Sequence, residues 1–164
     1  MKVLNDRQTK LRIRRLAYQI LENNFEEEEI ILAGINNNGM TFANLLNDQL
    51  SAITQQKITL TRIQLNPANP LAAEVKIDIP PLSLLGKVII VVDDVANTGR
   101  TIFYACKPLL ETLPKKIEVA VMVDRTHKSF PVRVDYFGLS LATTLLENID
   151  VQIQDVEEFG VFLN

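Results

Sequence analysis

The chain has 164 residues, of which 47% are hydrophobic and 23% are charged, and its net charge is −3. A chain of this length buries a core without covalent staples, and its single cysteine, Cys106, excludes a disulfide framework and a multi-cysteine metal cluster. Its single histidine, His127, leaves too little for a histidine zinc site or an ordinary Ser-His-Asp triad.

The beginning of the chain mixes charges and lacks the apolar run of a secretory signal. The longest nearly apolar stretch, residues 88–92, is far too short to cross a bilayer. We therefore expect a cytoplasmic protein that has no membrane partner.

Apolar periodicity alternates between helical and strand types along the chain. Helical spacing at residues 13–21 predicts a helix with Asp6 as its N-cap. A continuous apolar run at residues 29–35 then predicts a buried strand that feeds a loop, with Gly34 and Gly39 at its end. Further along the chain, the pattern predicts a helix at 41–53, strands at 58–65, 87–93 and 117–124, a helix at 99–113 that Pro108 kinks or ends early, and short strands at 132–137, 151–154 and 160–163.

This order of elements predicts an α/β fold with a mostly parallel sheet and helices on both faces, in one domain over residues 1–164. Residues 66–81 interrupt the pattern, because they hold four of the seven prolines and show no helical period. A segment of that length without regular structure indicates either a functional flap or a disordered insert.

The sharpest signal is residues 88–101, which read VIIVVDDVANTGRT. A buried strand ends in two carboxylates, and a short loop containing Gly99 then opens a helix. Ligands of such sheets lie outside the carboxyl ends of the strands, where N–H groups at a helix start favour a phosphate. The hydroxyls of Thr98 and Thr101 add donors to this loop.

Asp93 and Asp94 are acceptors suited to sugar hydroxyls or to water around a Mg²⁺ ion. Carboxylates at one end and anion donors at the other predict a site for a phosphorylated sugar. The P-loop and the G-x-G-x-x-G fingerprint are both absent from the sequence. The alternative interpretation is a capped helix start beside two solvated aspartates.

Residues 93–101, DDVANTGRT, resemble the phosphoribosyl diphosphate (PRPP) binding motif of the type I phosphoribosyltransferases. Residues 123–138, VDRTHKSFPVRVDYFG, are similar to the pyrimidine-operon attenuator proteins that double as uracil phosphoribosyltransferases. ILAGINNNG at 31–39 and ITLTR at 58–62 resemble their early glycine loop and third strand. The resemblance covers most of the chain and implies a Rossmann-like fold with a small C-terminal hood, together with a mobile flap at 66–81.

The implied reaction is displacement of pyrophosphate from C1 of PRPP by a base nitrogen, with Mg²⁺ neutralising the leaving group. Asp93 and Asp94 would hold the ribose hydroxyls, and also the metal through the ribose or water. Arg62 and Asn38 would stand at the catalytic positions that stabilise pyrophosphate. The implied substrate-binding set is Asp93, Asp94, Val95, Ala96, Asn97, Thr98, Gly99, Arg100 and Thr101, with Asn36, Asn37 and Gly39 from the glycine loop.

The chain departs from the pattern where the pattern supplies charge. Asn38 stands at an arginine position, and the flap carries no Lys or Arg before Lys76. An amide lacks the charge that makes a guanidinium–phosphate contact strong. These departures keep open an alternative, a weakly catalytic module that senses PRPP or nucleotides and is linked to RNA regulation of pyrimidine genes.

Two other features bear on the partners. Asn97 replaces the aspartate of enzymes that act on 6-oxopurines, and Leu139 and Ala142 replace expected base-side residues, so the acceptor base stays open with uracil favoured. The resemblance also implies a homodimer. RNA could meet a basic patch, although we favour an ordinary solvated surface for its members: Arg7, Lys10, Arg14, Arg15, Arg125, His127, Lys128 and Arg133.

Overall fold

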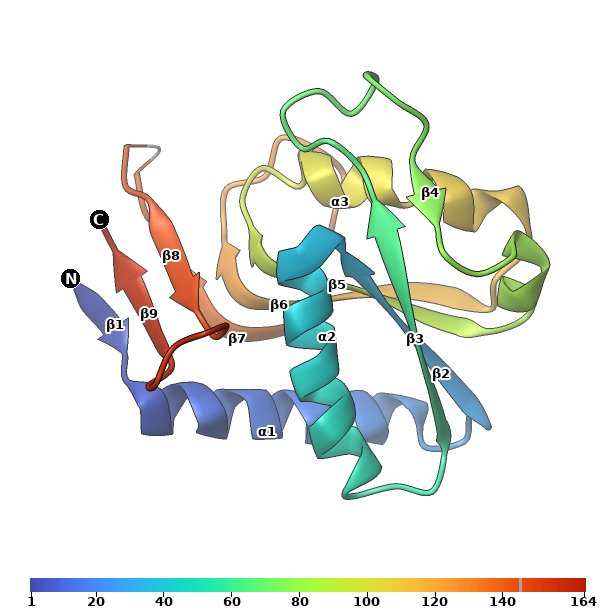
Figure 1. Cartoon of the computed structure of the whole chain (residues 1–164), viewed down its shortest axis with the longest axis horizontal. Helices are drawn as coiled ribbons and strands as arrows, with labels where there is room; N and C mark the ends of the chain where they lie inside the picture. Colours follow the sequence, from blue (N-terminus) through green and yellow to red (C-terminus); the bar gives the residue numbers. More distant parts are fainter. Residues whose placement is uncertain (145) are drawn as a thin grey trace.

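Two β-sheets organise the chain (Figure 1). The computed structural model describes residues 1–144 and 146–164. The larger sheet has six strands in the order β4-β3-β2-β5-β6-β7, all parallel except the edge strand β4. Its members are β2 (Glu29–Ile35), β3 (Lys57–Gln64), β4 (Lys76–Ile77), β5 (Val88–Ala96), β6 (Lys116–Arg125) and β7 (Tyr136–Leu141).

Helices cover both faces of this sheet. One face packs against α1 (Asp6–Asn24) and α2 (Asn36–Ser51), and the other against α3 (Arg100–Ala105) and the 3₁₀ segments η1 (Pro81–Leu84) and η2 (Lys107–Glu111). In Figure 1, α1 lies below the strands β5 and β6, and α3 lies above them. The strands β2 and β5 are buried on both sides, which explains their continuous apolar sequence. The predicted α/β architecture is confirmed.

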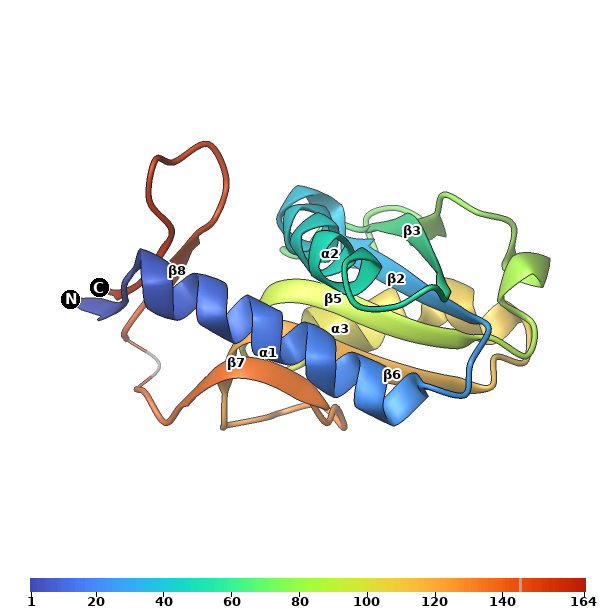
Figure 2. The same ribbon diagram turned by 90° about the horizontal axis from the view of Figure 1, so that it is seen from below.

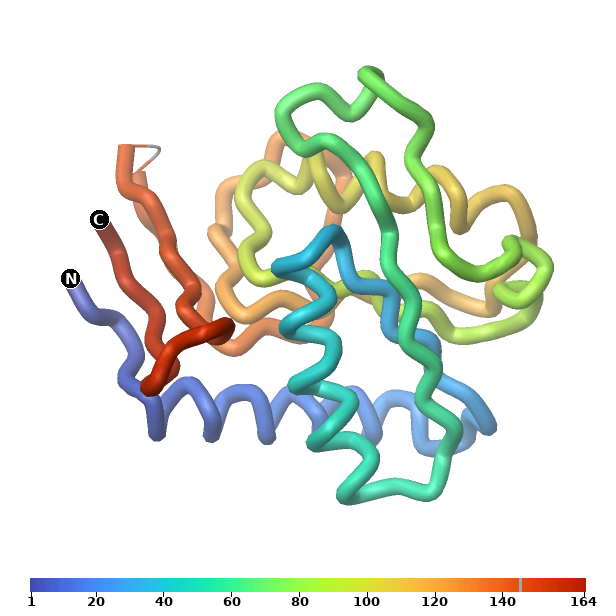
Figure 3. Tube along the Cα trace, viewed as in Figure 1, coloured from blue at the N-terminus to red at the C-terminus, as the bar shows by residue number. Residues whose placement is uncertain are grey.

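A second, antiparallel sheet forms a hood at one end of the molecule, in the order β1 (Lys2–Leu4), β9 (Gly160–Leu163), β8 (Ile149–Gln152). Figure 2 shows it projecting beyond the start of α1, and Figure 3 shows the two chain ends side by side within it. The Thr41 hydroxyl of α2 donates to the Gln154 side chain at 3.0 Å, so the hood is tied to the main body.

Several boundaries differ from the sequence prediction. Asn5, not Asp6, caps α1 through a reciprocal bond with Gln8. The strand predicted at 132–137 lies instead at Tyr136–Leu141, because Val132 and Val134 pack as a connecting segment beneath the α3 face. The helix predicted at 99–113 ends early, as Pro108 indicated: α3 stops at Ala105 and Pro108 lies in η2.

The second half of segment 66–81 has more structure than the composition predicts. Its strand β4 pairs with β3, with Ile63 opposite Ile77, and Val75 is buried in the core beside α3. The apolar residues near its end thus anchor the segment to the sheet edge. Figure 1 shows its first half as the green loop that rises from β3.

Within the described ranges, no helix is long and apolar enough to cross a membrane.

The start of α2 lies unusually close to the sheet. A Cβ added at Gly39 would lie 2.5 Å from the Val92 carbonyl oxygen of β5, and one added at Gly34 would lie 2.7 Å from the Met40 backbone. The approach is possible because Gly34 and Gly39 both lack a Cβ atom. It places the first turn of α2 beside the carboxyl end of β5.

Replacing Gly39 by Ala should therefore destabilise the fold by about 1–3 kcal/mol, because the new methyl group meets backbone that must shift. Urea unfolding followed by circular dichroism would show the loss as a lower midpoint. The control is Asn44→Ala on the exposed face of the same helix, which should leave the midpoint nearly unchanged. Equal midpoints for Gly39→Ala and the unmodified protein would contradict this account of the contact.

Candidate active site

The aspartate pair lies at the carboxyl ends of the parallel strands, in the middle of the larger sheet. Asp93 and Asp94 belong to the end of β5, which runs between β2 and β6. The Asp93 carboxylate accepts a hydrogen bond from the Asp94 N–H at 2.9 Å, and the Asp94 carboxylate accepts one from the Val95 N–H at 2.9 Å. Each carboxylate is thus fixed by the next backbone amide.

The two aspartates are not equivalent. Burial raises the pKa of Asp93 well above its ordinary value, and the negative charge of Asp94 raises that pKa further. A cation or a hydrogen-bond donor from a ligand would relieve both effects. Such perturbed acids in a cleft are typical of functional sites.

The phosphate loop follows at the same end of the parallel strands. Gly99 adopts φ 88°, a conformation that favours glycine, and a Cβ added there would lie 3.1 Å from the Val132 side chain. The Thr98 carbonyl accepts hydrogen bonds from the N–H groups of Ser129 and Phe130, at 3.0 and 3.1 Å. The loop is therefore held from outside by the segment after β6, and its hydroxyl groups stay near the cavity.

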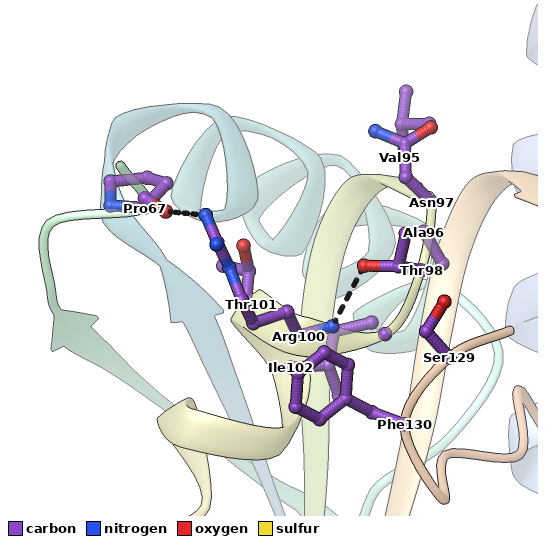
Figure 4. Close-up of a pocket in the computed structure, with 11 residues that line it drawn as sticks. Pro67, Val95, Ala96, Asn97, Thr98, Arg100, Thr101, Ile102, Ser129 and Phe130 are labelled. Carbon is purple, nitrogen blue, oxygen red and sulfur yellow. Dashed lines mark hydrogen bonds between the residues drawn. The ribbon is translucent and has the colours of Figure 1, made fainter. Parts of the chain in front are cut away.

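Two adjoining cavities meet at the carboxyl ends of these strands, and Figure 4 shows the residues that line the first of them. One, of about 580 Å³, is lined by residues 95–102 together with Pro67, Ser129 and Phe130. The other, of about 430 Å³, is lined by Asn36–Asn38, Asp93, Asp94 and Ile149 of the hood. They share Pro67, Val95, Asn97 and Thr101. The structure thus brings the predicted carboxylates and the predicted phosphate loop into one continuous cleft.

The predicted glycine loop is a helix start rather than a loop. Asn36 begins α2 with φ 52°, and its side-chain amide donates to the Leu65 carbonyl at 2.9 Å and accepts from the Leu65 N–H at 3.1 Å. Asn37 and Asn38 are exposed and line the carboxylate cavity. Gly39 is buried against β5, so its part is to let the helix approach.

Arg62 does not line either cavity. Its strand neighbours at alternate positions, Ile58 and Leu60, pack with the α1 and α2 cluster, so its side chain starts toward the same face. Its Nε is buried and has no hydrogen-bond partner within the described residues. Asn38 therefore lines the cavity that holds the two aspartates, whereas Arg62, which the sequence grouped with it, does not.

Six residues of the cleft were not singled out by the sequence: Ile35, Pro67, Ile102, Ser129, Phe130 and Ile149. Ser129 and Phe130 lie within the stretch 123–138, whose resemblance was noted without assigning them a role. Pro67 and Ile149 carry no chemical signal of their own, because they contribute shape rather than charge.

Two groups of the basic residues differ in how they are placed. Arg7, Lys10 and Arg14 line a groove of about 650 Å³ with exposed Tyr18. Arg125 is buried and donates to the Glu147 carbonyl, while Lys128 pairs with Asp124 at 2.7 Å. Arg125 and Lys128 are therefore used within the fold.

Comparison with known proteins agrees with this geometry. The phosphoribosyl transferase domain family matches residues 2–158. The chain belongs to the phosphoribosyltransferase family. It is 32% identical over 164 residues to the bifunctional protein PyrR of Staphylococcus aureus (strain bovine RF122 / ET3-1), covering 95% of this chain and 93% of that one. It is 33% identical over 159 residues to the bifunctional protein PyrR of Streptococcus equi subsp. zooepidemicus, covering 95% and 92%.

Solved structures show the same type I phosphoribosyltransferase fold. The hypoxanthine phosphoribosyltransferase of Trypanosoma cruzi superposes with a TM-score of 0.76 at 15% identity, covering 98% of this chain and 95% of that one. A hypoxanthine-guanine phosphoribosyltransferase of Bacillus anthracis gives 0.71 at 21% identity, covering 85% and 81%. The expected family and fold class are confirmed.

The pKa of Asp93 has a consequence for stability. The folded chain resists ionising this carboxyl, whereas the unfolded chain ionises it freely, so its ionisation favours unfolding as pH rises above the ordinary carboxyl pKa of about 4. Asp93→Asn should therefore raise the urea midpoint of the ligand-free protein at pH 7.5. The gain should be smaller at pH 5, because ionisation of Asp93 in the unfolded chain lowers the free energy of unfolding less at that pH.

The matched control is Asp48→Asn on the exposed face of α2, which should change the midpoint little at either pH. A midpoint of Asp93→Asn below that of the unmodified protein at pH 7.5 would contradict the assigned pKa direction.

Proposed function

We propose that this phosphoribosyltransferase joins PRPP to a pyrimidine base of the uracil class and releases pyrophosphate. One observation carries the proposal: a carboxylate pair and an anion-binding loop line adjoining cavities that share Val95, Asn97 and Thr101. A molecule that spans them needs a phosphate at one end and hydroxyl donors near the other. Ribose 5-phosphate carrying a leaving group meets that description.

In this arrangement Asp93 and Asp94 accept hydrogen bonds from the ribose hydroxyls, and amides and hydroxyls of residues 96–101 hold the 5′-phosphate. A base nitrogen forms a bond to C1 while the bond from C1 to the pyrophosphate oxygen breaks. Negative charge on the two carboxylates also stabilises the positive charge that develops on the ribose ring. The hood residue Ile149 and Pro67 help to exclude water from C1.

A divalent cation fits this set of side chains. Within the described ranges, no group of three or more His, Cys, Asp or Glu side chains could hold a metal ion. This argues against a metal site built from protein side chains alone. Mg²⁺ is usually bound by one or two carboxylates together with substrate phosphates, and Asp93 and Asp94 supply such a pair. Mg²⁺ bound with PRPP would neutralise the leaving pyrophosphate.

The choice of a pyrimidine rests on two supports. The relatives at 32–33% identity are bifunctional proteins PyrR, and the resemblance of residues 123–138 points to the same branch. Asn97 lines both cavities and cannot act as the proton acceptor expected for 6-oxopurines. The same resemblance supports a cytoplasmic homodimer.

The direct test measures pyrophosphate release from PRPP and Mg²⁺ with uracil, orotate, adenine, guanine or hypoxanthine. We expect release with uracil and little with the other bases. Asp93→Asn and Asp94→Asn should each reduce PRPP binding by at least about tenfold, since a charge-assisted hydrogen bond contributes about 1.5–3 kcal/mol. PRPP binding that survives both substitutions would show that the site is assigned wrongly.

Asn38→Arg tests whether the lack of a positive charge at this position limits the rate of pyrophosphate release. Asn38 is exposed and lines the carboxylate cavity, so a guanidinium there could reach the leaving pyrophosphate. We expect kcat to rise about tenfold, as one charge-assisted hydrogen bond would allow. Asn44→Arg on the exposed part of α2 adds the same charge away from the cavity and should leave kcat unchanged. Equal kcat values for both variants would rule out leaving-group stabilisation as the limit.

A second candidate function is a PRPP-sensing or nucleotide-sensing module with little catalysis. The observation that favours it is charge: among the described residues lining the two cavities, Arg100 alone is basic, and its guanidinium is bonded to Pro67. PRPP binding without pyrophosphate release for any of the five bases would support this candidate. RNA linkage would then appear as retention on an RNA column that is lost between roughly 50 and 200 mM salt.

A further inference from the structure

The start of the flap is held by side chains from both halves of the cleft. Arg100, the first residue of α3, donates from Nη2 to the Pro67 carbonyl at 2.7 Å (Figure 4). Asn36, the first residue of α2, makes two hydrogen bonds to the backbone of Leu65. The entrance to the flap is thus held on both sides, at Leu65 just before it and at Pro67 within it.

The held segment lies at the junction of the cavities, because Pro67 lines both of them. The chain beyond it is made compact by its own side chains: Asn66 accepts from the Ala68 N–H at 3.0 Å, and Asn69 accepts from the Leu71 N–H at 3.2 Å. A movement of this first half of the flap therefore has to break the Arg100–Pro67 bond.

We infer that Arg100 is a positioning residue for the transfer reaction, which holds Pro67 over the junction of the phosphate and carboxylate cavities. The inference rests on the proposed function for its catalytic consequence, whereas the contact itself belongs to the fold. With Pro67 in place, the apolar ring limits the entry of water to C1 of the ribose. Without the contact, the flap opens more often, and water competes with the base.

The alternative role for Arg100 is attraction of the substrate phosphate by charge. Arg100→Gln separates the two, because glutamine keeps N–H donors for the Pro67 carbonyl but carries no charge. Positioning predicts that Gln retains part of the function that Arg100→Ala loses. Charge attraction predicts that Gln and Ala are equally impaired and that the loss is confined to the KM for PRPP.

Flap exposure gives a measurement that does not require activity. Leu71, in the flap, is exposed and can be cut by chymotrypsin, and mass spectrometry identifies the fragment that ends there. Arg100→Ala should speed this cleavage and the hydrogen exchange of the Ala68 amide by about five- to thirtyfold, as expected for loss of one solvent-exposed hydrogen bond. Arg100→Gln should fall between Ala and the unmodified protein.

The control is Lys107→Ala, which removes an exposed positive charge from η2, near α3, and should leave cleavage and exchange unchanged. The catalytic measurement is the ratio of base-independent PRPP hydrolysis to base-dependent transfer. This ratio should rise about fivefold or more in Arg100→Ala.

Unchanged cleavage and exchange in a folded Arg100→Ala protein would overturn the inference, whatever the activity. Faster cleavage with an unchanged ratio of hydrolysis to transfer would also overturn it, because the flap would then move without affecting the reaction. If the unmodified protein transfers to no base, the proposed function fails separately, and the cleavage measurements still decide whether Arg100 positions the flap.

Discussion

The close contact between the start of α2 and the sheet is the constraint on which the cleft depends. Because Gly39 has no side chain, the α2 backbone reaches the Val92 carbonyl, one residue before Asp93. That contact sets the distance between the asparagines of α2 and the carboxylates of β5. It also places Asn36 where its amide bonds Leu65, so the position of the flap follows from the same packing.

Apart from the contact of Arg100 with Pro67, the rest of the cleft is held by backbone groups. The aspartates are oriented by the amides of the next residues, and the phosphate loop is held by amides after β6 through the Thr98 carbonyl. Backbone N–H groups therefore orient the aspartates and hold the phosphate loop in place. The cost is electrostatic, because Asp93 is left beside Asp94 in a buried position that raises its pKa.

The sequence predicted the parts of this site that have a chemical signature. The apolar run of β5, its two aspartates and the Thr-Gly loop could be located because burial, charge and backbone freedom leave marks on residue type. The Asn36–Asn38 turn was predicted as a loop, since three asparagines favour caps and turns over helix interiors, and packing of Gly39 on β5 decided otherwise. The placements of Arg62 and Phe130 could not be predicted in this way. They depend on which side chains the folded chain directs into the cleft, and a single sequence does not contain that information.

The hood makes one wall of the site depend on both ends of the chain. Its central strand β9 pairs with β1, with Lys2 opposite Phe162, and also with β8, which carries Ile149 into the cleft. The aspartates and the phosphate loop, by contrast, belong to the larger sheet and its connections. The sugar-phosphate half of the cleft is therefore built from neighbouring strands, whereas the wall that Ile149 contributes depends on pairing between the first and the last strand of the chain.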